Sequence, residues 1–88
     1  MITVNRLDEN TFDVVVKAAS VTTHRVTVPE EYYRKLTGGK ISKEKLVEDS
    51  FKFLLKRESN TMIFTEFQLP VIGRYFPEYV QTMKGTQK

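Results

Sequence analysis

The chain contains no cysteine and only one histidine among its 88 residues. The absence of cysteine excludes a disulfide framework, a thiolate metal site and a cysteine nucleophile. A single histidine excludes, within one chain, a metal site with two histidine ligands and a mechanism that needs two histidines. No stretch approaches the roughly 20 apolar residues of a membrane-spanning helix, and the N-terminus lacks the apolar run of a signal peptide. We therefore expect a cytoplasmic protein that begins at Met1, does not contact membranes and needs no cofactor.

Net charge is also small. The chain carries 14 Lys and Arg against 11 Asp and Glu, which gives a charge of +3. This balance permits an anionic partner but does not require one. Hydrophobic residues make up 40% of the chain and charged residues 28%, as in an ordinary folded soluble domain. At this length we expect one domain over residues 1–88, with strands over about 2–28, helices over about 29–83 and a loose tail at 84–88.

The first third of the chain alternates between apolar and polar residues, which is typical of strands. Ile2 and Val4 begin this pattern, and the segment LDEN supplies turn-forming residues. Two further alternations follow, with their apolar positions at Phe12, Val14, Val16 and Ala18, and then at Val26 and Val28 together with Thr22 and His24. Short connections between such segments favour an antiparallel meander. The prediction is an α+β fold with an N-terminal three-stranded antiparallel meander, followed by several helices packed on one face.

Helix signals begin at Pro29, which suits the first turn of a helix. The segment PEEYYRKLT is expected to be helical until Gly38 and Gly39, because glycine tolerates a left-handed helix end. Ser42 is a predicted cap for a longer helix from Lys43 to about Arg57, whose wide apolar arc makes it the centre of the core. The spacing of apolar residues after RESNT predicts a short helix over about 61–66.

The C-terminal stretch FQLPVIGRYFPEYVQTM is unusually rich in aromatic residues for a chain end. Pro70 and Pro77 can each open a helical turn, and we expect a bend at Phe76 because a residue before proline avoids the helical region. Such short helices must pack on other parts of the chain. The stretch is therefore predicted to be mostly core, with Tyr75 or Tyr79 able to project outward as an aromatic rim.

Several of these motifs occur together in a known group of proteins. The run from VTVPEEYYRKLTGGK to FQLPVIGRYFPEY resembles a group of small uncharacterised bacterial proteins. These share a β-rich start, a Tyr-Tyr helix followed by Leu-Thr-Gly-Gly, and an ending close to Arg-Tyr-Phe-Pro-Glu-Tyr. Because no function is attached to the group, the resemblance implies no active site.

Two motifs bear on catalysis and phosphate binding. His24 could act as a general base near Glu30 or Glu31, but no nucleophile spacing accompanies it, so a ring satisfied by backbone or water is the favoured interpretation. The segment TGGKIS lacks the first glycine of a phosphate-binding loop and the hydroxyl residue that should follow Lys40. We therefore expect no enzymatic activity.

Nucleic-acid binding remains the alternative hypothesis. Tyrosine stacking beside cations is typical of single-strand binding. The candidate contacts on and after the first helix are Tyr33, Arg34, Lys35, Lys40 and Lys43. Acidic residues alternate with the cations, however, and Lys45 with Asp49 and Glu48 with Lys52 have the spacing of helical ion pairs.

The favoured hypothesis is a small non-enzymatic binding or accessory protein that acts through protein–protein contacts, including a homodimer. A small sheet leaves edge strands open, and these can pair with another chain. The predicted contact surfaces are the sheet edge, the outer sheet face with Thr23, Arg25 and Thr27, and the rim formed by Tyr75 and Tyr79.

Overall fold

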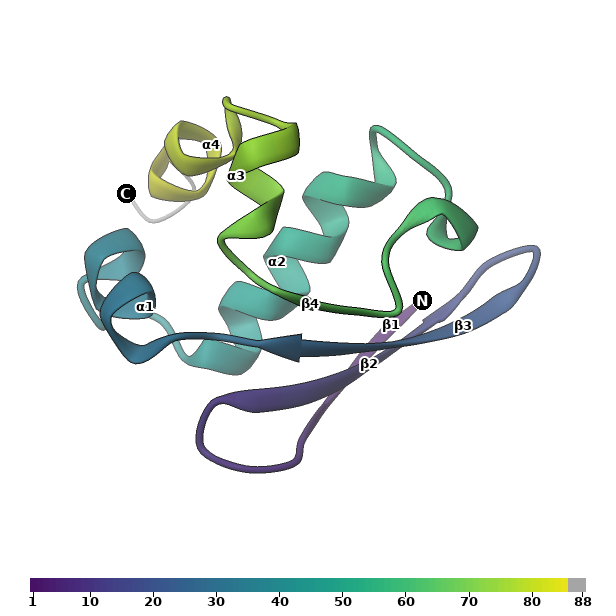
Figure 1. The fold of residues 1–88 in the computed structure, drawn as a ribbon, viewed down its shortest axis with the longest axis horizontal. Helices are drawn as coiled ribbons and strands as arrows, with labels where there is room; N and C mark the ends of the chain where they lie inside the picture. The colour runs from purple at the N-terminus through teal and green to yellow at the C-terminus, as the bar shows by residue number, and fades with distance from the viewer. Residues whose placement is uncertain (86–88) are drawn as a thin grey trace.

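The computed structural model describes residues 1–85, which form one sheet with helices packed on one of its faces (Figure 1). The meander is confirmed. Strands β1 (Ile2–Arg6), β2 (Thr11–Lys17) and β3 (Val21–Thr27) pair antiparallel in sequence order. Their alternating residues divide between a buried face and an open one, as expected for a sheet covered on one side.

A fourth strand, β4 (Glu66–Gln68), lies beside β3 and runs parallel to it. The predicted helix over 61–66 is therefore wrong. A short 3-10 helix, η1 (Asn60–Met62), comes first and the chain then extends. Within the described residues the sheet order is β1-β2-β3-β4, so β1 and β4 are its two edges. The sheet is mixed rather than purely antiparallel.

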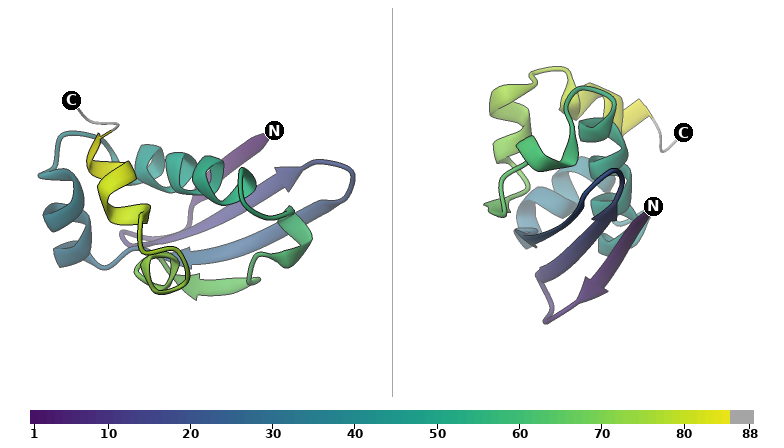
Figure 2. Two further views of the ribbon diagram at one scale, coloured as in Figure 1. Left: turned by 90° about the horizontal axis from the view of Figure 1, so that it is seen from above. Right: turned by 90° about the vertical axis from the view of Figure 1, so that its right-hand side faces the viewer.

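The main helices form where their capping signals lie. Helix α1 (Glu30–Thr37) ends at Gly38, whose φ of 63° is the left-handed conformation that glycine adopts easily. Helix α2 (Lys43–Leu55) begins after Ser42, whose side chain accepts a hydrogen bond from the Lys45 amide. It lies across the sheet and supplies much of the core (Figure 2). The buried residues of α2 include Leu46, Val47, Ser50, Phe51, Phe53 and Leu54.

The C-terminal stretch forms two short helices, α3 (Val71–Tyr75) and α4 (Tyr79–Gly85), with the predicted break at Phe76 and Pro77. Ile72, Tyr79 and Met83 are buried, which confirms that the stretch is largely core. The predicted loose tail at 84–88 is wrong for its first two residues, since Lys84 and Gly85 belong to α4. Residues 86–88 lie outside the described part of the chain.

A polar network joins η1 and the chain after it to the meander. The buried Asn60 side chain donates to the Ser20 carbonyl at 3.0 Å and to Thr22 Oγ1 at 2.9 Å. Thr22 Oγ1 lies 2.8 Å from His24 Nε2, and His24 Nδ1 lies 2.8 Å from the Phe64 carbonyl. Because a carbonyl only accepts, Nδ1 carries the proton in that bond. These bonds hold residues 60–64 against the meander and so lead the chain into β4.

Candidate functional site

Lys43 does not form part of a surface for nucleic acid. Its side chain is only 8% exposed, and the ammonium donates to Glu30 Oε1 at 2.6 Å, Asn10 Oδ1 at 2.9 Å and the Glu9 carbonyl at 3.3 Å. An ammonium has three protons, so these acceptors use all of them. The assignment of Lys43 as a nucleic-acid contact is therefore wrong, because the residue joins the starts of α1 and α2 to the turn between β1 and β2.

The other residues predicted to contact nucleic acid differ in whether they already have partners within the chain. Arg34 is exposed but pairs with Glu30 at 2.8 Å. The Tyr33 hydroxyl donates to the Ile41 carbonyl, and the Tyr33 ring lies beneath the Lys43 ammonium. Among residues 1–85, Lys35 and Lys40 are exposed and have no ion-pair partner. The predicted set therefore presents two free cations rather than a continuous basic surface.

Tyr79 is also misplaced by the sequence prediction, because it is fully buried. Its ring packs edge-on against Phe53 at a centroid distance of 5.2 Å. Its hydroxyl lies 2.6 Å from Ser50 Oγ, which in turn donates to the Leu46 carbonyl at 2.7 Å. Since the single Ser50 proton is used in that second bond, Tyr79 is the donor to Ser50. Burial raises the pKa of the Tyr79 hydroxyl well above its usual range.

Arg25 lies on the open face of the sheet, as predicted. It pairs with Asp13 across β2 and β3, with Nε 3.1 Å from Oδ1. The hydrogen bond with Asp13 raises the pKa of the guanidinium, and the nearby Glu66 carboxylate adds to this effect. The predicted face around Arg25 also carries Thr23 and Thr27, so it is polar and its charge is matched within the chain.

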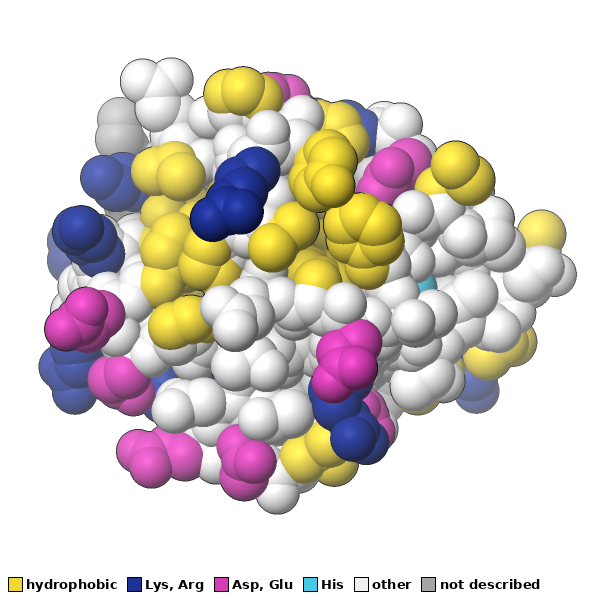
Figure 3. All heavy atoms as spheres, in the orientation of Figure 1, with side chains coloured by type: hydrophobic (Ala, Val, Ile, Leu, Met, Phe, Trp, Pro, Cys, Tyr) yellow, Lys and Arg dark blue, Asp and Glu magenta, His cyan; other side chains and the backbone are white. Residues whose placement is uncertain are grey.

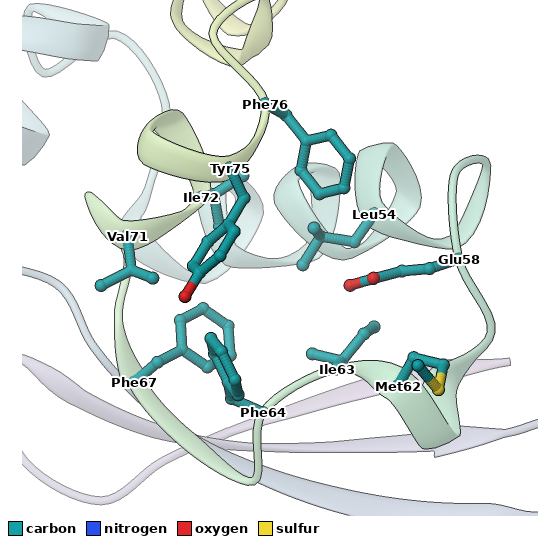
Figure 4. A pocket seen from close by; sticks show the side chains of 10 residues that line it. All are labelled: Leu54, Glu58, Met62, Ile63, Phe64, Phe67, Val71, Ile72, Tyr75 and Phe76. Atoms are coloured by element: carbon teal, nitrogen blue, oxygen red, sulfur yellow. The ribbon is translucent and has the colours of Figure 1, made fainter.

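Tyr75 is 63% exposed, and it lies at an apolar groove that the sequence did not predict. Figure 3 shows hydrophobic side chains gathered on this face of the molecule. The groove lies between the end of α2, η1, β4 and α3, and its cavity measures about 140 Å³. Its lining residues are Leu54, Glu58, Met62, Ile63, Phe64, Phe67, Val71, Ile72, Tyr75 and Phe76 (Figure 4).

Three aromatic rings form one wall of the groove. Phe64 lies edge-on to Tyr75 at a centroid distance of 5.6 Å and to Phe67 at 6.5 Å. Phe64 is 51% exposed and Met62 is 69% exposed, whereas Ile63 and Ile72 are buried at the floor. The bond from His24 to the Phe64 carbonyl fixes the backbone that presents this ring. The floor of the groove is therefore buried and fixed by contacts within the chain, whereas its rim is exposed to solvent.

Glu58 is the one carboxylate among the residues that line the groove. Figure 4 shows its carboxylate directed towards the space between Leu54 and Ile63. Within residues 1–85 this carboxylate has no ion-pair or hydrogen-bond partner. The neighbouring Arg57 is used elsewhere, because it stacks on Phe53 and pairs with Glu78 at 3.0 Å. The groove therefore combines apolar walls with one unpaired negative charge.

The sequence signal for this groove was present but ambiguous. In the segment Glu66–Leu69 polar and apolar residues alternate, which is the period of a strand, but the segment is too short to outweigh the helical spacing of Ile63 and Phe67. Because the chain after η1 is extended rather than helical, Phe64 is exposed on the groove side, beside Met62 of η1. The rim residue Tyr75 was predicted, whereas Met62, Phe64 and Glu58 were missed.

Neither a metal centre nor a membrane-spanning helix is found in the part of the chain that the structure describes. No group of three or more His, Asp or Glu side chains over residues 1–85 is arranged to hold a metal ion. None of the helices in that range is long and apolar enough to cross a bilayer. In comparisons with known proteins, no family model, no curated protein and no solved structure matches the chain.

Proposed function

We propose that this protein is a small non-enzymatic binding module that acts in the cytoplasm through a protein partner. The observation that carries this proposal is the apolar groove with its exposed rim of Met62, Phe64 and Tyr75. Aromatic residues and methionine are enriched in protein–protein interfaces, and a compact group of them at the surface marks an interaction site more often than chance.

The chemistry of the lining supports binding rather than catalysis. Apart from the Glu58 carboxylate and the Tyr75 hydroxyl, the side chains that line the groove are hydrocarbon or thioether. Catalysis of acyl or phosphoryl transfer needs a nucleophile with a base beside it, or donors that stabilise a developing charge. The chain's one histidine is buried at 1% exposure, and both its ring nitrogens are hydrogen-bonded.

Nucleic-acid binding has less support. Phosphate contacts need several free cations along one surface, because each contact releases counterions and contributes to affinity. Of the predicted contacts, Lys43 is buried and Arg34 is paired with Glu30. Among the cations predicted to contact nucleic acid, only Lys35 and Lys40 have no ion-pair partner within residues 1–85. The same reasoning predicts little affinity for RNA or single-stranded DNA even at low salt.

The test is a pull-down of the tagged protein from native lysate, carried out with and without nuclease. The groove variant Phe64→Ser/Tyr75→Ser should lose the captured protein, because both exposed rings of the rim are removed. The matched control is Val21→Ser, since Val21 is 65% exposed at the start of β3 and does not line the groove. A protein kept by wild type and control but lost by the groove variant supports the proposal. Capture that is unchanged in the groove variant, or that disappears with nuclease, would refute it.

A further inference from the structure

The partner's chemistry can be inferred from the groove, on the premise that the proposed protein-binding function is correct. We propose that the groove binds an extended peptide segment in which an apolar side chain and a lysine or arginine stand two residues apart, so that both lie on the groove face of the added strand. The segment adds to the open edge of β4 as a fifth strand. The apolar side chain enters the cavity and the cation pairs with Glu58.

The size of the cavity limits what enters it. Its volume of about 140 Å³ is close to that of apolar cavities of about 150 Å³ that hold one benzene molecule. Small-molecule sites are usually larger, at about 300–1,000 Å³. The groove therefore has room for one aromatic or branched aliphatic side chain rather than for a whole metabolite. A single inserted side chain is how peptide-binding grooves obtain specificity.

Glu58 determines the charge of the partner. A neutral apolar occupant would cover this carboxylate and remove water from it without providing a partner, which opposes binding. A lysine or arginine beside the inserted side chain would instead form a charge-assisted hydrogen bond. Glu66 on β4 lies on the opposite face of the sheet, beside Arg25, so the free charge at the groove is that of Glu58. An acidic segment would be repelled by the Glu58 carboxylate.

The open edge of β4 provides the backbone contacts. The Arg25 amide donates to the Thr65 carbonyl and the Leu69 amide donates to the Thr27 carbonyl, so residues 65, 67 and 69 direct their backbone groups towards β3. In a parallel pair the intervening residues direct theirs to the other side. The backbone groups of Glu66 and Gln68 therefore lie along the open edge. A strand added there places alternate side chains on the face where Phe67 lies, which is the groove face.

A second copy of the chain fits this surface less well than a cationic peptide. A two-fold contact uses the same surface of both copies, so it would bring two Glu58 carboxylates into one interface. Like charges gathered in this way oppose association. A basic peptide avoids that cost and neutralises the charge instead.

The experiment begins with selection from a display library of random peptides, about 12 residues long, against the immobilised full-length chain. Enriched peptides should share an apolar residue with a lysine or arginine two positions away. The affinity of the tightest one is then measured by fluorescence anisotropy with wild-type protein and variants. Glu58→Gln should weaken binding at least about fivefold, because a charged hydrogen-bond acceptor is lost. The matched control Glu31→Gln removes the same charge from α1 and should change the affinity less than about twofold.

A second pair of variants tests strand addition. Gln68→Pro removes an edge amide without removing a bond to β3, and proline is tolerated on edge strands. It should weaken peptide binding about tenfold, whereas Gln68→Ala keeps the amide and should bind like wild type. Thermal unfolding of each variant verifies that the fold is retained.

Several results would overturn the inference. These are enriched peptides that are acidic or lack a cation, the absence of any enrichment, equal affinity of Gln68→Pro and Gln68→Ala, and a dimer in sedimentation that Phe64→Ser abolishes. Failure of this inference is distinguishable from failure of the proposed function. A captured protein that still depends on Phe64 and Tyr75 keeps the binding function, even if the selected peptides have the wrong chemistry. Loss of that dependence in the pull-down refutes the function itself.

Discussion

Replacing Lys43 by methionine should destabilise the protein by removing a buried ammonium while keeping most of the side-chain stem. The ammonium makes three hydrogen bonds, the shortest to Glu30 at 2.6 Å, and the side chain is 8% exposed. Hydrogen bonds to charged groups contribute about 1.5–3 kcal/mol each when they are considered singly. Part of this is recovered in the variant, because Glu30 is 38% exposed and regains water, and because the ammonium no longer has to be desolvated.

The net loss expected for Lys43→Met is about 2 kcal/mol in the free energy of unfolding. For a domain of this size, 1 kcal/mol changes the melting temperature by about 4–8 °C, so the midpoint should fall by about 8–16 °C. The assay is urea unfolding followed by circular dichroism, together with a thermal scan. Lys45→Met is the matched control, because the Lys45 side chain is 49% exposed and pairs only with Asp49 at the surface. It should change stability by less than about 0.5 kcal/mol.

The ion pair between Lys43 and Glu30 also makes the stability of the protein depend on pH. The hydrogen bond from Lys43 is the main cause that lowers the pKa of Glu30 below its ordinary value of 4.5, and Arg34 adds to it. Because the folded pKa is the lower one, the unfolded chain binds this proton first as the pH falls. The stabilisation is therefore present above pH 4.5 and is lost as the pH falls through the lowered pKa. The difference in the free energy of unfolding between wild type and Lys43→Met should therefore become smaller as the pH falls through this range. A difference that is the same at neutral and acidic pH, or a Lys43→Met variant as stable as Lys45→Met, would refute the structural role of Lys43.

Two further predictions concern the backbone and the core. Gly38→Ala should destabilise the protein by about 1 kcal/mol in urea unfolding, because Gly38 has a φ of 63° although no atom would contact the added methyl group. Gly73→Ala, at a helical position with only an ordinary contact to Val80, should be neutral or stabilising; equal losses for both variants would contradict this. Tyr79→Phe should cost about 1 kcal/mol, measured in the same way, because the bond to Ser50 is lost from a fully buried site. An unchanged stability would show that this hydroxyl is not part of the core network.

The parts of the fold that could be predicted are those set by neighbours in the sequence. Alternation at Phe12, Val14 and Val16 predicted a strand with one buried face, and Ser42 and Gly38 marked the helix ends at the correct positions. These signals depend only on local periodicity and backbone conformation. The break at Pro77 was predictable for the same reason.

The missed elements depend on contacts between distant segments. Strand β4 forms because Asn60, Thr22 and His24 attach the chain to β3, and no local pattern shows which polar residues will meet. Lys43 was assigned to the surface because lysine is seldom buried, but here acceptors from Glu9, Asn10 and Glu30 surround it.

The candidate site shows the same division between local and distant signals. The sequence offered Tyr75 or Tyr79 for the aromatic rim without choosing between them, and Tyr75 is the one that is exposed. Its partner in that prediction, Tyr79, is buried instead, because it lies against Ser50 of α2. Met62, Phe64 and Glu58 become a groove only when η1, β4 and α3 meet around one cavity. The tertiary arrangement therefore determines which exposed side chains form the groove.

The most direct test of the account is amide-resolved NMR of the labelled protein during titration with the captured partner protein. If partners bind at the groove, the largest chemical-shift changes should lie over residues 62–68 and at Tyr75, with smaller changes at Glu58. The amides of Lys35 in α1 and of Lys40 in the loop after it should remain unaffected. Changes centred on Lys35 and Lys40, with none over residues 62–68, would contradict the claim that the groove is the binding surface.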